Sequence, residues 1–555
     1  KYAKDKLVVN FITKQYRYGG YVQADGLQTI GYDHGDYNVA TNYVKGNNSY
    51  TIFAGANYSH VDGTETWNNE NYQFPQSLFD RESYSKNSYR NHQEYMQFRY
   101  QNQKGKRYWV GKFTLVNLST PRNASSGFAR ESIETDIFSN IRKKSLSPKI
   151  DLNANLPLSK NQTLTLGVHG KYSANSYHRL YQEQPFEAMT DEDEKALSFQ
   201  LSAIYNYFSQ KHSLSVELFH YHDVWNADYS GNCELWQHLW KGESLAFFSY
   251  NFQASRRLSL KTRIGLDWLQ YHLHGDNSFS QLSPRINTNV QYQLNKGMLL
   301  WSFNFMNSNH GMDVINRAMI QVNSHMMEKG MPELKKSHDI NTYLYYMGRF
   351  NRLSVSAIGQ FRYNHHPVTD DYYLDEANGK IVKTYSNGGN AQYYSAILAL
   401  QYKLCKFANL SGDIRYNHAE VKTTWSKHNN NLTGNLGLNM FMGDFALKPY
   451  LHFGKKSLDE AALVISKTPI NYGMSCSYSR GNLYIELQAV SPFKKQEKRY
   501  WLDLPIYSYS KSIKDQTASQ YASIKVAYSF DFGRKAQKVE KDVNKNINSS
   551  LLRVE

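Results

Sequence analysis

Residues 258–268 read LSLKTRIGLDW, and their side chains alternate between two chemical kinds. Every second position from Leu258 to Trp268 carries Leu, Thr, Ile or Trp, whereas the positions between them carry Ser, Lys, Arg, Gly and Asp. Successive side chains of a β-strand point to opposite faces. This stretch therefore predicts a strand with one apolar face and one charged face.

The same period of two recurs along the chain, for example in residues 213–218, 353–362 and 522–532. In an early segment, Tyr50 and Tyr58 bracket a row of apolar residues on one face. Eight residues in a strand tilted by about 40° climb roughly 20 Å, which approaches the ~25 Å apolar band of a membrane barrel. Alternation alone also suits a half-buried strand of a soluble sandwich.

The connections between the strands separate these two interpretations. Many strand pairs are joined by very short polar turns, at 45–48, 103–105, 158–160, 210, 255–256, 295, 350–351, 405, 443–444 and 480–481. Between them lie longer connections, such as 62–89, 119–148, 174–193, 309–337 and 367–390. Short turns at one end and long loops at the other are typical of an outer-membrane barrel.

The predicted fold is all-β: a single transmembrane antiparallel β-barrel of about 22 strands, with short periplasmic turns and long extracellular loops. The strands are expected at 19–32, 36–45, 49–62, 90–103, 106–119, 146–156, 161–176, 194–208, 211–225, 243–254, 257–273, 280–294, 296–308, 338–349, 352–365, 390–403, 406–420, 428–442, 445–455, 467–480, 481–493 and 517–532. Residues 500–510 are expected to form β structure in the last long loop.

Composition agrees with this prediction. The chain of 555 residues is 15% aromatic with 45 Tyr, and membrane barrels gather aromatic residues at both interfaces. An aromatic-rich extracellular β-sandwich is the alternative. The net charge of +16 comes from Lys and Arg that are scattered through the hairpins and concentrated near the end of the chain. We therefore expect anionic lipid headgroups or lipopolysaccharide as partners, and no nucleic acid.

Motifs of catalysis are missing from the sequence. There is no Gly-rich phosphate loop, no HExxH and no GxSxG, and the three cysteines are too widely spaced for a metal-ligand motif. We expect no enzyme, no catalytic residue and no cofactor. The acidic run 191–194 could bind Ca²⁺, but it lacks the alternating ligand spacing of a calcium loop, so a solvated loop tip is favoured.

The lumen of such a barrel is expected to need a plug. A cylinder of 22 strands is about 43 Å across, which side chains cannot fill. Residues 1–18 are predicted to be the remnant of a plug and its linker, residues 19–533 the barrel, and residues 534–555 a charged tail. The plug itself would belong to a missing N-terminal region or to another chain, or it would be absent.

Short sequence boxes carry a resemblance to a known family. Residues 7–20, LVVNFITKQYRYGG, resemble the junction of plug and barrel in TonB-dependent receptors. Residues 316–318, NRA, and 330–336, GMPELKK, resemble the paired boxes around the seventh long loop of that family. The ending 521–535, YASIKVAYSFDFGRK, is similar to barrel endings of Bacteroidota-type members.

The resemblance implies a location and a function. It implies a protein of the bacterial outer membrane that imports a scarce nutrient, such as an iron chelate, haem, cobalamin, an oligosaccharide or a peptide. A plug would gate the lumen, an inner-membrane energising complex of the TonB type would move the plug, and a surface lipoprotein is a further candidate partner. A plugless barrel that acts as a structural or assembly component of an outer-membrane complex is the alternative.

Candidate functional residues lie in the predicted loops and on the charged strand faces. The loop candidates for ligand binding are His325, Arg317, His365, His366, Trp225, Trp236 and Trp240. In haem receptors of the resembling family a loop histidine at the place of His325 ligates haem, so it is also a candidate metal ligand, and the adjacent pair His365 and His366 could bind a metal as well. The loop tryptophans could stack on a sugar, a porphyrin or a siderophore, or anchor the interface.

Strand parity predicts a second set that faces the lumen. Its members are Glu217, Lys261, Arg263, Arg362 and Lys525. They could bind a translocating solute or structural water, and contact with a plug is the favoured role.

Overall fold

The computed structural model describes residues 18–74, 77–276, 278–308, 311, 313–515, 519–533, 543–547 and 549. Every regular element in these ranges is a β-strand, and no helix among them is long and apolar enough to span a membrane. The predicted plug remnant, apart from Tyr18, lies outside the described residues. So does most of the predicted charged tail.

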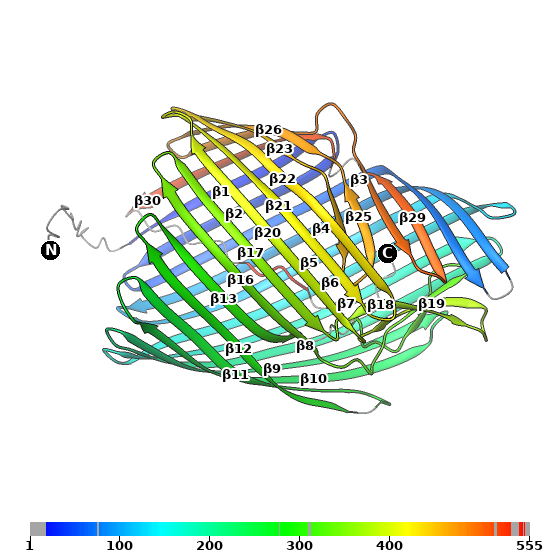
Figure 1. Ribbon diagram of the computed structural model, residues 1–555, viewed down its shortest axis with the longest axis horizontal. Coiled ribbons are helices and arrows are strands. Elements are labelled where there is room, and N and C mark those ends of the chain that lie inside the picture. The colour runs from blue at the N-terminus through cyan, green and yellow to red at the C-terminus, as the bar shows by residue number, and fades with distance from the viewer. Residues whose placement is uncertain are drawn as a thin grey trace.

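Twenty-two of the strands form a closed antiparallel barrel (Figure 1). Each strand pairs with the next one around the barrel, and β1 pairs with β30 from Gly19 opposite Gly533 to Ile30 opposite Ala522. The barrel strands are β1 (Tyr18–Ile30), β2 (Asp33–Lys45), β3 (Asn48–Phe74), β4 (Ser77–Lys104), β5 (Arg107–Arg130), β6 (Glu134–Ser159), β7 (Gln162–Glu183), β8 (Phe186–Phe208), β9 (His212–Gly231), β10 (Leu235–Gln253), β11 (Leu258–Leu273), β12 (Phe279–Leu294), β13 (Gly297–Ser308), β16 (Ser337–Phe350), β17 (Leu353–His365), β20 (Asn390–Lys403), β21 (Ala408–Lys422), β22 (Ser426–Met442), β23 (Phe445–His452), β26 (Asn471–Arg480), β27 (Leu483–Val490) and β30 (Tyr521–Gly533). The predicted strand number is confirmed.

The apolar face of each strand points outward. On β11, Ile264 is 49% exposed and Trp268 is 47% exposed, whereas Asp267 between them is fully buried. A soluble sandwich would press its Leu, Ile and Val residues into a dry interior. Here such residues form the outer surface of nearly every barrel strand, as contact with lipid requires. The sandwich alternative is therefore wrong.

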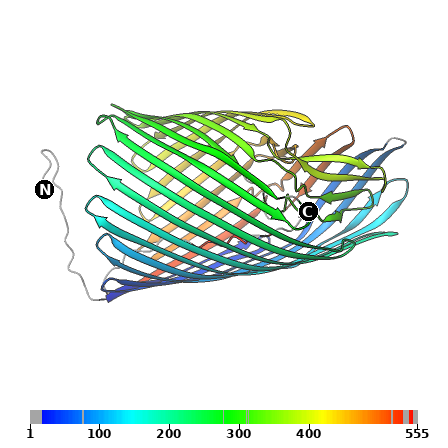
Figure 2. The ribbon, with the colours of Figure 1, turned by 90° about the horizontal axis from the view of Figure 1, so that it is seen from below.

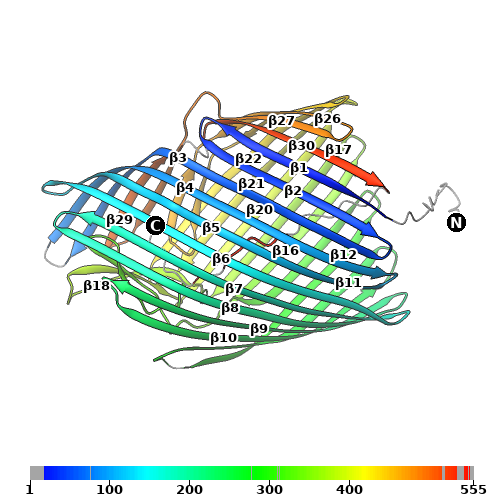
Figure 3. The same cartoon turned by 180° about the vertical axis from the view of Figure 1, so that it is seen from behind.

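The long connections are strands rather than loops. The hairpins β3–β4, β5–β6 and β7–β8 keep their ladders far beyond the predicted strand ends, and the pairing of β3 with β4 continues to Phe74 opposite Ser77. Outside the membrane one face of a hairpin meets water and the other faces polar groups of the mouth, so the hydrophobic alternation stops while the backbone ladder continues. The predicted long connections at 62–89, 119–148 and 174–193 are therefore present, but their strands extend further than predicted. In Figures 1 and 3 these hairpins project from one end of the barrel.

Eight shorter strands lie at that same end (Figure 2). Four of them extend the barrel sheet: β24 (Lys455–Asp459), β25 (Val464–Thr468), β28 (Glu497–Asp503) and β29 (Tyr507–Lys514). The predicted β segment at 500–510 is thereby confirmed. Because β2 begins only at Asp33, the far part of β3 would have an open edge, and β29 pairs with it from Tyr72 to Glu65. Unpaired edges are sites of aggregation, and this pairing removes one.

The other four strands form a separate sheet at the mouth of the barrel. They are β14 (Met319–Gln321), β15 (Met326–Lys329), β18 (Thr369–Asp375) and β19 (Lys380–Ser386). β15 pairs with β14 and, in parallel, with β19. The connection between β13 and β16 is therefore joined to the connection between β17 and β20.

Candidate functional site

The connection between β13 and β16 folds across the mouth of the barrel as an internal hairpin. We use this name for residues 313–336, which contain β14 and β15. Ile320 and Ala318 are buried against Tyr229 of β9. Met326 is buried in another cluster with Tyr72 of β3 and Ile381 of β19. The hairpin is thus packed between opposite parts of the barrel wall, which fixes its place over the lumen.

The two sequence boxes of this connection meet in space. A Cβ on Gly330 would lie 2.1 Å from the carbonyl oxygen of Asn316, so only glycine allows this approach. The Asn316 side chain accepts a hydrogen bond from Gln237 at 2.6 Å and donates one to the hydroxyl of Tyr229 at 2.5 Å. Lys336, at the end of the second box, is buried and lies 2.9 Å from Asp267. The boxes therefore attach the hairpin to β9, β10 and β11.

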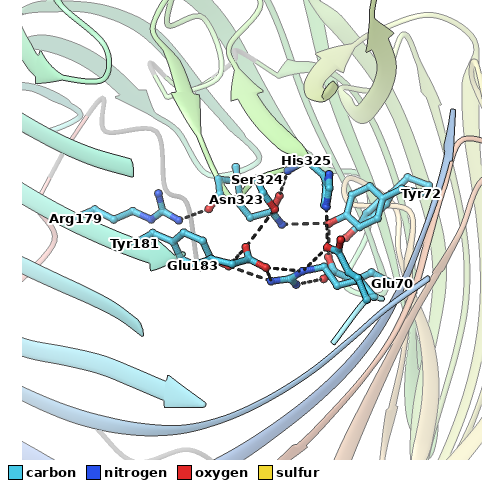
Figure 4. A network of polar contacts seen from close by, with 12 residues as sticks. Glu70, Tyr72, Arg179, Tyr181, Glu183, Asn323, Ser324 and His325 are labelled. Carbon is cyan, nitrogen blue, oxygen red and sulfur yellow. Dashed lines mark hydrogen bonds and ion pairs between the residues drawn. The ribbon is translucent and has the colours of Figure 1, made fainter. Parts of the chain in front are cut away.

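A buried polar network holds the tip of the hairpin (Figure 4). Its centre is Arg81 of β4, which lies 2.7 Å from Glu70 and 3.0 Å from Glu183 and also donates to the hydroxyl of Tyr181. Glu131 lies 3.7 Å from the same guanidinium. Burial acts to lower the pKa of Arg81, but attraction to Glu70 and its neighbours raises it above the ordinary value. Arg81 therefore stays charged in a site that would otherwise hold three uncompensated carboxylates.

The turn between β14 and β15 supplies the other half of this network. Asn323 donates to the hydroxyl of Tyr72 at 3.1 Å, and Ser324 donates to Glu183 at 3.2 Å. Arg179 of β7 donates to the backbone carbonyls of Gln321 and Val322 at 2.7 and 2.5 Å. Figure 4 shows these side chains converging from the wall and from the hairpin. The hairpin tip is therefore attached to the wall by directed hydrogen bonds as well as by packing.

His325, one of the candidate ligand-binding residues, belongs to this network. Its Nε2 lies 2.7 Å from Glu131, and its ring lies against Tyr72 and Phe79 with centroid separations of 5.3 and 5.5 Å. A haem ligand needs a free ring nitrogen, so coordination through Nε2 would require His325 to leave Glu131. In this structure, the contact with Glu131 makes His325 part of the network that attaches the hairpin tip to the wall.

A cavity of about 530 Å³ opens beside the hairpin between β17, β18 and the turn after β24. Its charged lining consists of Arg362, Asp370, Asp459 and Glu460. Burial raises the pKa of Asp370 and of Glu460, although Lys383 and Arg362 respectively act in the opposite direction. The cavity is thus lined by three carboxylates and one guanidinium.

Two carboxylates of the predicted acidic loop tip point into the barrel. Glu192 is 2% exposed and Glu194 is 1% exposed, because both lie on the inner face of β8. Burial first, and then repulsion by Glu194, raises the pKa of Glu192 to about 9. The prediction of a solvated loop tip was wrong for these two residues. Among the described residues, no group of three or more His, Cys, Asp and Glu side chains is arranged to hold a metal ion.

The three predicted loop tryptophans lie on the extended strands β9 and β10. Trp225 is 5% exposed and packs against Leu239 and Leu269, so it offers no face to a ligand. Trp236 is 50% exposed and stacks with His238 at a centroid separation of 6.1 Å. Trp240 lies four positions further along β10, on the same face as Trp236. The structure therefore separates one core residue from two residues of the outer face.

The remaining loop candidates lie near the mouth but apart from one another. Arg317 forms an ion pair with Asp276 at 3.1 Å. The rings of His365 and His366 stack at a centroid separation of 3.9 Å, at the end of β17. Their ring planes are 30° apart, as in a stacked pair. None of the three is in the network around Arg81.

The five predicted lumen residues share the inner face. Glu217 and Arg263 form an ion pair at 2.5 Å, and Arg263 lies over the ring of Phe247. Arg362 pairs with Asp339 at 2.6 Å. In the strand register, Lys261 lies opposite Asn289, and Lys525 lies opposite Glu486. Their contacts are with the wall, and contact with a plug stays a prediction.

The residues that hold the hairpin were not predicted from the sequence. Glu70 and Arg81 lie in the predicted connection 62–89, whereas Glu183 lies in the predicted connection 174–193, 102 positions from Arg81. A signal was present only in spacing: Glu70, Tyr72 and Phe74 alternate, as do Arg179, Tyr181 and Glu183. Period-two placement of charged and aromatic residues would have indicated strands with a functional inner face.

Solved structures with the same architecture include receptors and transporters. A copper transporter, OprC, superposes with a TM-score of 0.65 at 11% identity over 93% of this chain and 81% of that one. The FrpB iron transporter from Neisseria meningitidis gives 0.60 at 8% identity, over 93% and 82%. The siderophore receptor PirA from Pseudomonas aeruginosa gives 0.57 at 11% identity, over 93% and 81%. No family model and no curated protein matches the sequence. The chain has the closed 22-stranded barrel fold of TonB-dependent outer-membrane receptors.

Proposed function

We propose that this chain is an outer-membrane transporter of the TonB-dependent receptor type, which imports a scarce nutrient through its lumen. One observation carries the proposal: the lumen is wide and polar, and the internal hairpin closes its mouth through Arg81 and packed aromatic residues. A passive channel needs no such cover. A covered lumen suits capture of a solute at the mouth followed by controlled release inward.

The mouth cavity favours a cargo that presents positive charge. Asp370, Asp459 and Glu460 outnumber Arg362 in its lining, and Lys383 lies 3.4 Å from Asp370. An excess of one sign of charge in a cavity concentrates solutes of the opposite sign. The similar solved structures are named as a copper transporter, an iron transporter and a siderophore receptor. We therefore place a metal ion or a metal complex with exposed positive groups first among the predicted cargoes.

The proposed cycle also needs the partners predicted from the sequence. A plug from a preceding part of the natural protein, or from another chain, would gate the lumen. An inner-membrane energising complex would move that plug, and a surface lipoprotein is a further candidate at the mouth. Anionic lipid would surround the apolar band.

Uptake by the source bacterium tests the proposal. A deletion strain and its complemented parent would be grown on limiting copper, iron, iron chelates, haem, cobalamin, oligosaccharides and peptides. We expect a growth defect on one of these nutrients, with intact resistance to detergents. In complemented cells, Asp370→Asn with Glu460→Gln should raise the half-saturation concentration for that nutrient about tenfold, because about 1.4 kcal/mol of attraction is lost.

A matched variant separates the cavity from the general charge of the mouth. Asp503→Asn removes a carboxylate that is highly exposed and does not line the cavity, so uptake should be unchanged. If the deletion strain grew as well as the complemented strain on every nutrient but lost membrane integrity, this result would contradict transport and support the structural role.

A further inference from the structure

A short segment beyond the last strand lies against the inner wall of the barrel. In residues 543–547, Val543 and Ile547 pack on the cluster of Phe53, Tyr95 and Val116. Between them, the ammonium of Lys545 lies 4.2 Å from the centre of the Tyr95 ring. Positions 543, 545 and 547 are partly buried, whereas 544 and 546 are exposed. The segment therefore contacts the wall with every second side chain.

The wall under this segment differs from the rest of the inner face. Phe53 is 1% exposed and Val116 is fully buried, although both lie on the inner faces of β3 and β5. Their near neighbours on that face, Thr51 and Thr114, are polar. An apolar side chain on a wet inner face stabilises the protein only when another group covers it and removes it from water. Residues 543–547 supply that cover.

The Tyr95 ring is held in the position that the segment uses. Its hydroxyl donates to the Asn38 side chain at 2.6 Å. The ring also lies against Gly55, where a Cβ would come within 2.7 Å of it. The platform under Lys545 is therefore held by contacts that do not involve the segment, and such preorganisation lowers the entropy cost of binding.

Lys149 of β6 recognises the backbone of the segment. Its ammonium donates to the carbonyl oxygens of Asn544 and Asn546, both at 2.7 Å. Because one ammonium reaches both carbonyls, their oxygens lie closer together than the roughly 6.6 Å spacing of a fully extended chain. The backbone N–H of Asn546 also donates to the Asn544 side chain, so the backbone is contracted at this point. Lys149 is 5% exposed, and a buried ammonium is costly without acceptors. The wall therefore combines an apolar contact surface with a donor aimed at peptide carbonyls.

We propose that this wall patch is a peptide-binding site and that residues 543–547 are its resident ligand, which obstructs the lumen as a tethered segment. The patch consists of Phe53, Tyr95, Val116 and Lys149. Its occupant is a piece of the same chain with apolar residues at i and i+4 and a cation at i+2. The idea that solutes pass only after the segment leaves rests on the proposed transport function. Binding of the segment to the patch and its obstruction of the lumen do not depend on that function.

Disulfide trapping tests the binding. In the full chain with Cys233, Cys405 and Cys476 replaced by Ser, Val116→Cys is combined with Ile547→Cys. Mild oxidation should link the two positions, as shown by mass spectrometry of the joined peptides. The matched control is Leu115→Cys with Ile547→Cys, because Leu115 is the adjacent residue and is exposed on the outer face. No link with Val116→Cys, or an equal link with Leu115→Cys, would overturn the proposal.

Conductance of the purified full chain in planar lipid bilayers tests the obstruction. Val543→Asp with Ile547→Asp should raise the mean conductance at least severalfold, since two charges cannot remain on Phe53 and Val116. Val543→Leu with Ile547→Leu should leave it unchanged. Lys149→Met should act like the Asp pair, and Lys144→Met, on the outer face of the same strand, should not. Conductance equal to that of the native chain in both the Asp pair and Lys149→Met would show that the segment obstructs nothing.

These outcomes are independent of the uptake experiment. Trapping and conductance use the purified chain without an energising complex, so a strain without a nutrient defect would leave them unchanged. Conversely, a failed trap would leave the proposal of transport intact.

Discussion

Arg81 is the residue on which the closed mouth depends most, because it is the cation among Glu70, Glu183 and Glu131. Removing one partner of a buried ion pair leaves an uncompensated charge and typically costs about 3–5 kcal/mol. We expect Arg81→Met to loosen the hairpin tip by a free energy of that size. Hydrogen–deuterium exchange of residues 319–329 would show it as at least a hundredfold loss of protection.

An exposed arginine on the same sheet is the control for this prediction. Arg130 also pairs with a carboxylate, Glu134, at 2.6 Å, but both side chains are more than half exposed. Such pairs contribute little, so Arg130→Met should leave the exchange of the hairpin as it is. Similar protection in the two variants would mean that packing alone holds the hairpin.

Glu192 predicts how the mouth responds to pH. Its pKa is raised to about 9 in the folded chain by burial and by Glu194, whereas the unfolded carboxyl has its ordinary value near 4.5. Between these values the folded state holds the extra proton, so stability is fully present below about pH 4.5 and declines as the pH rises toward 9. Exchange protection around β8 should therefore fall at least tenfold more in the native chain than in Glu192→Gln between pH 5 and pH 8. Parallel profiles of the two proteins would place the origin of any pH response elsewhere.

At the scale of single elements, the barrel strands could be predicted and the mouth could not. Lipid on one side and water on the other impose alternation, and residues 258–268 carry it completely. The far half of β4 reads DRESYSKNSYR and has water or polar partners on both faces. The sequence therefore shows no hydrophobic period there, although the ladder to β3 is unbroken apart from one bulge. Trp225 shows the opposite case: it was predicted as a ligand-binding residue of a loop, but it is buried in a hydrophobic cluster.

The internal hairpin shows why the site was hidden as well. Its boxes were visible as a resemblance, but their partners Gln237, Tyr229 and Asp267 lie on strands distant in the sequence. Long-range polar pairs leave no local pattern in one sequence. The lumen-facing charges could be predicted because parity within a strand is local, as for Glu217 and Arg263.

Gly330 gives a test of the hairpin as one element. A Cβ at this position would lie 2.1 Å from the carbonyl oxygen of Asn316 and 2.7 Å from its backbone nitrogen, so Gly330→Ala must separate the two boxes. We expect loss of the Asn316 contacts and a destabilisation of the hairpin by about 1–3 kcal/mol. Limited proteolysis of intact cells should cut within residues 313–336 faster than in the native protein. Gly359→Ala, where a Cβ would meet nothing within 4 Å, is the control, and equal cutting in both would contradict the close contact.

At the scale of the whole molecule, one sheet serves two solvents. The outer face is apolar over the middle of the strands, while the inner face carries ion pairs such as Arg285 with Asp267 and Glu243. The inner charges need a wet or polar lumen, and the outer residues need lipid. The sheet therefore suits only a closed barrel inserted in lipid, and the pairing of β1 with β30 removes the last open edge.

A charge placed on either face tests that arrangement. Ile264 lies on the outer face near the middle of the apolar row from Leu258 to Trp268, so Ile264→Arg would put a guanidinium into hydrocarbon. We expect it to lower the free energy of unfolding from lipid vesicles by about 2–4 kcal/mol, which is the cost of an arginine near the bilayer midplane. Gln291 stands opposite Ser259 on the inner face, so Gln291→Arg meets water and should cost less than about 1 kcal/mol. Urea titrations of the folded fraction in vesicles would measure both, and an equal cost for the two substitutions would mean that the outer face of β11 does not contact lipid.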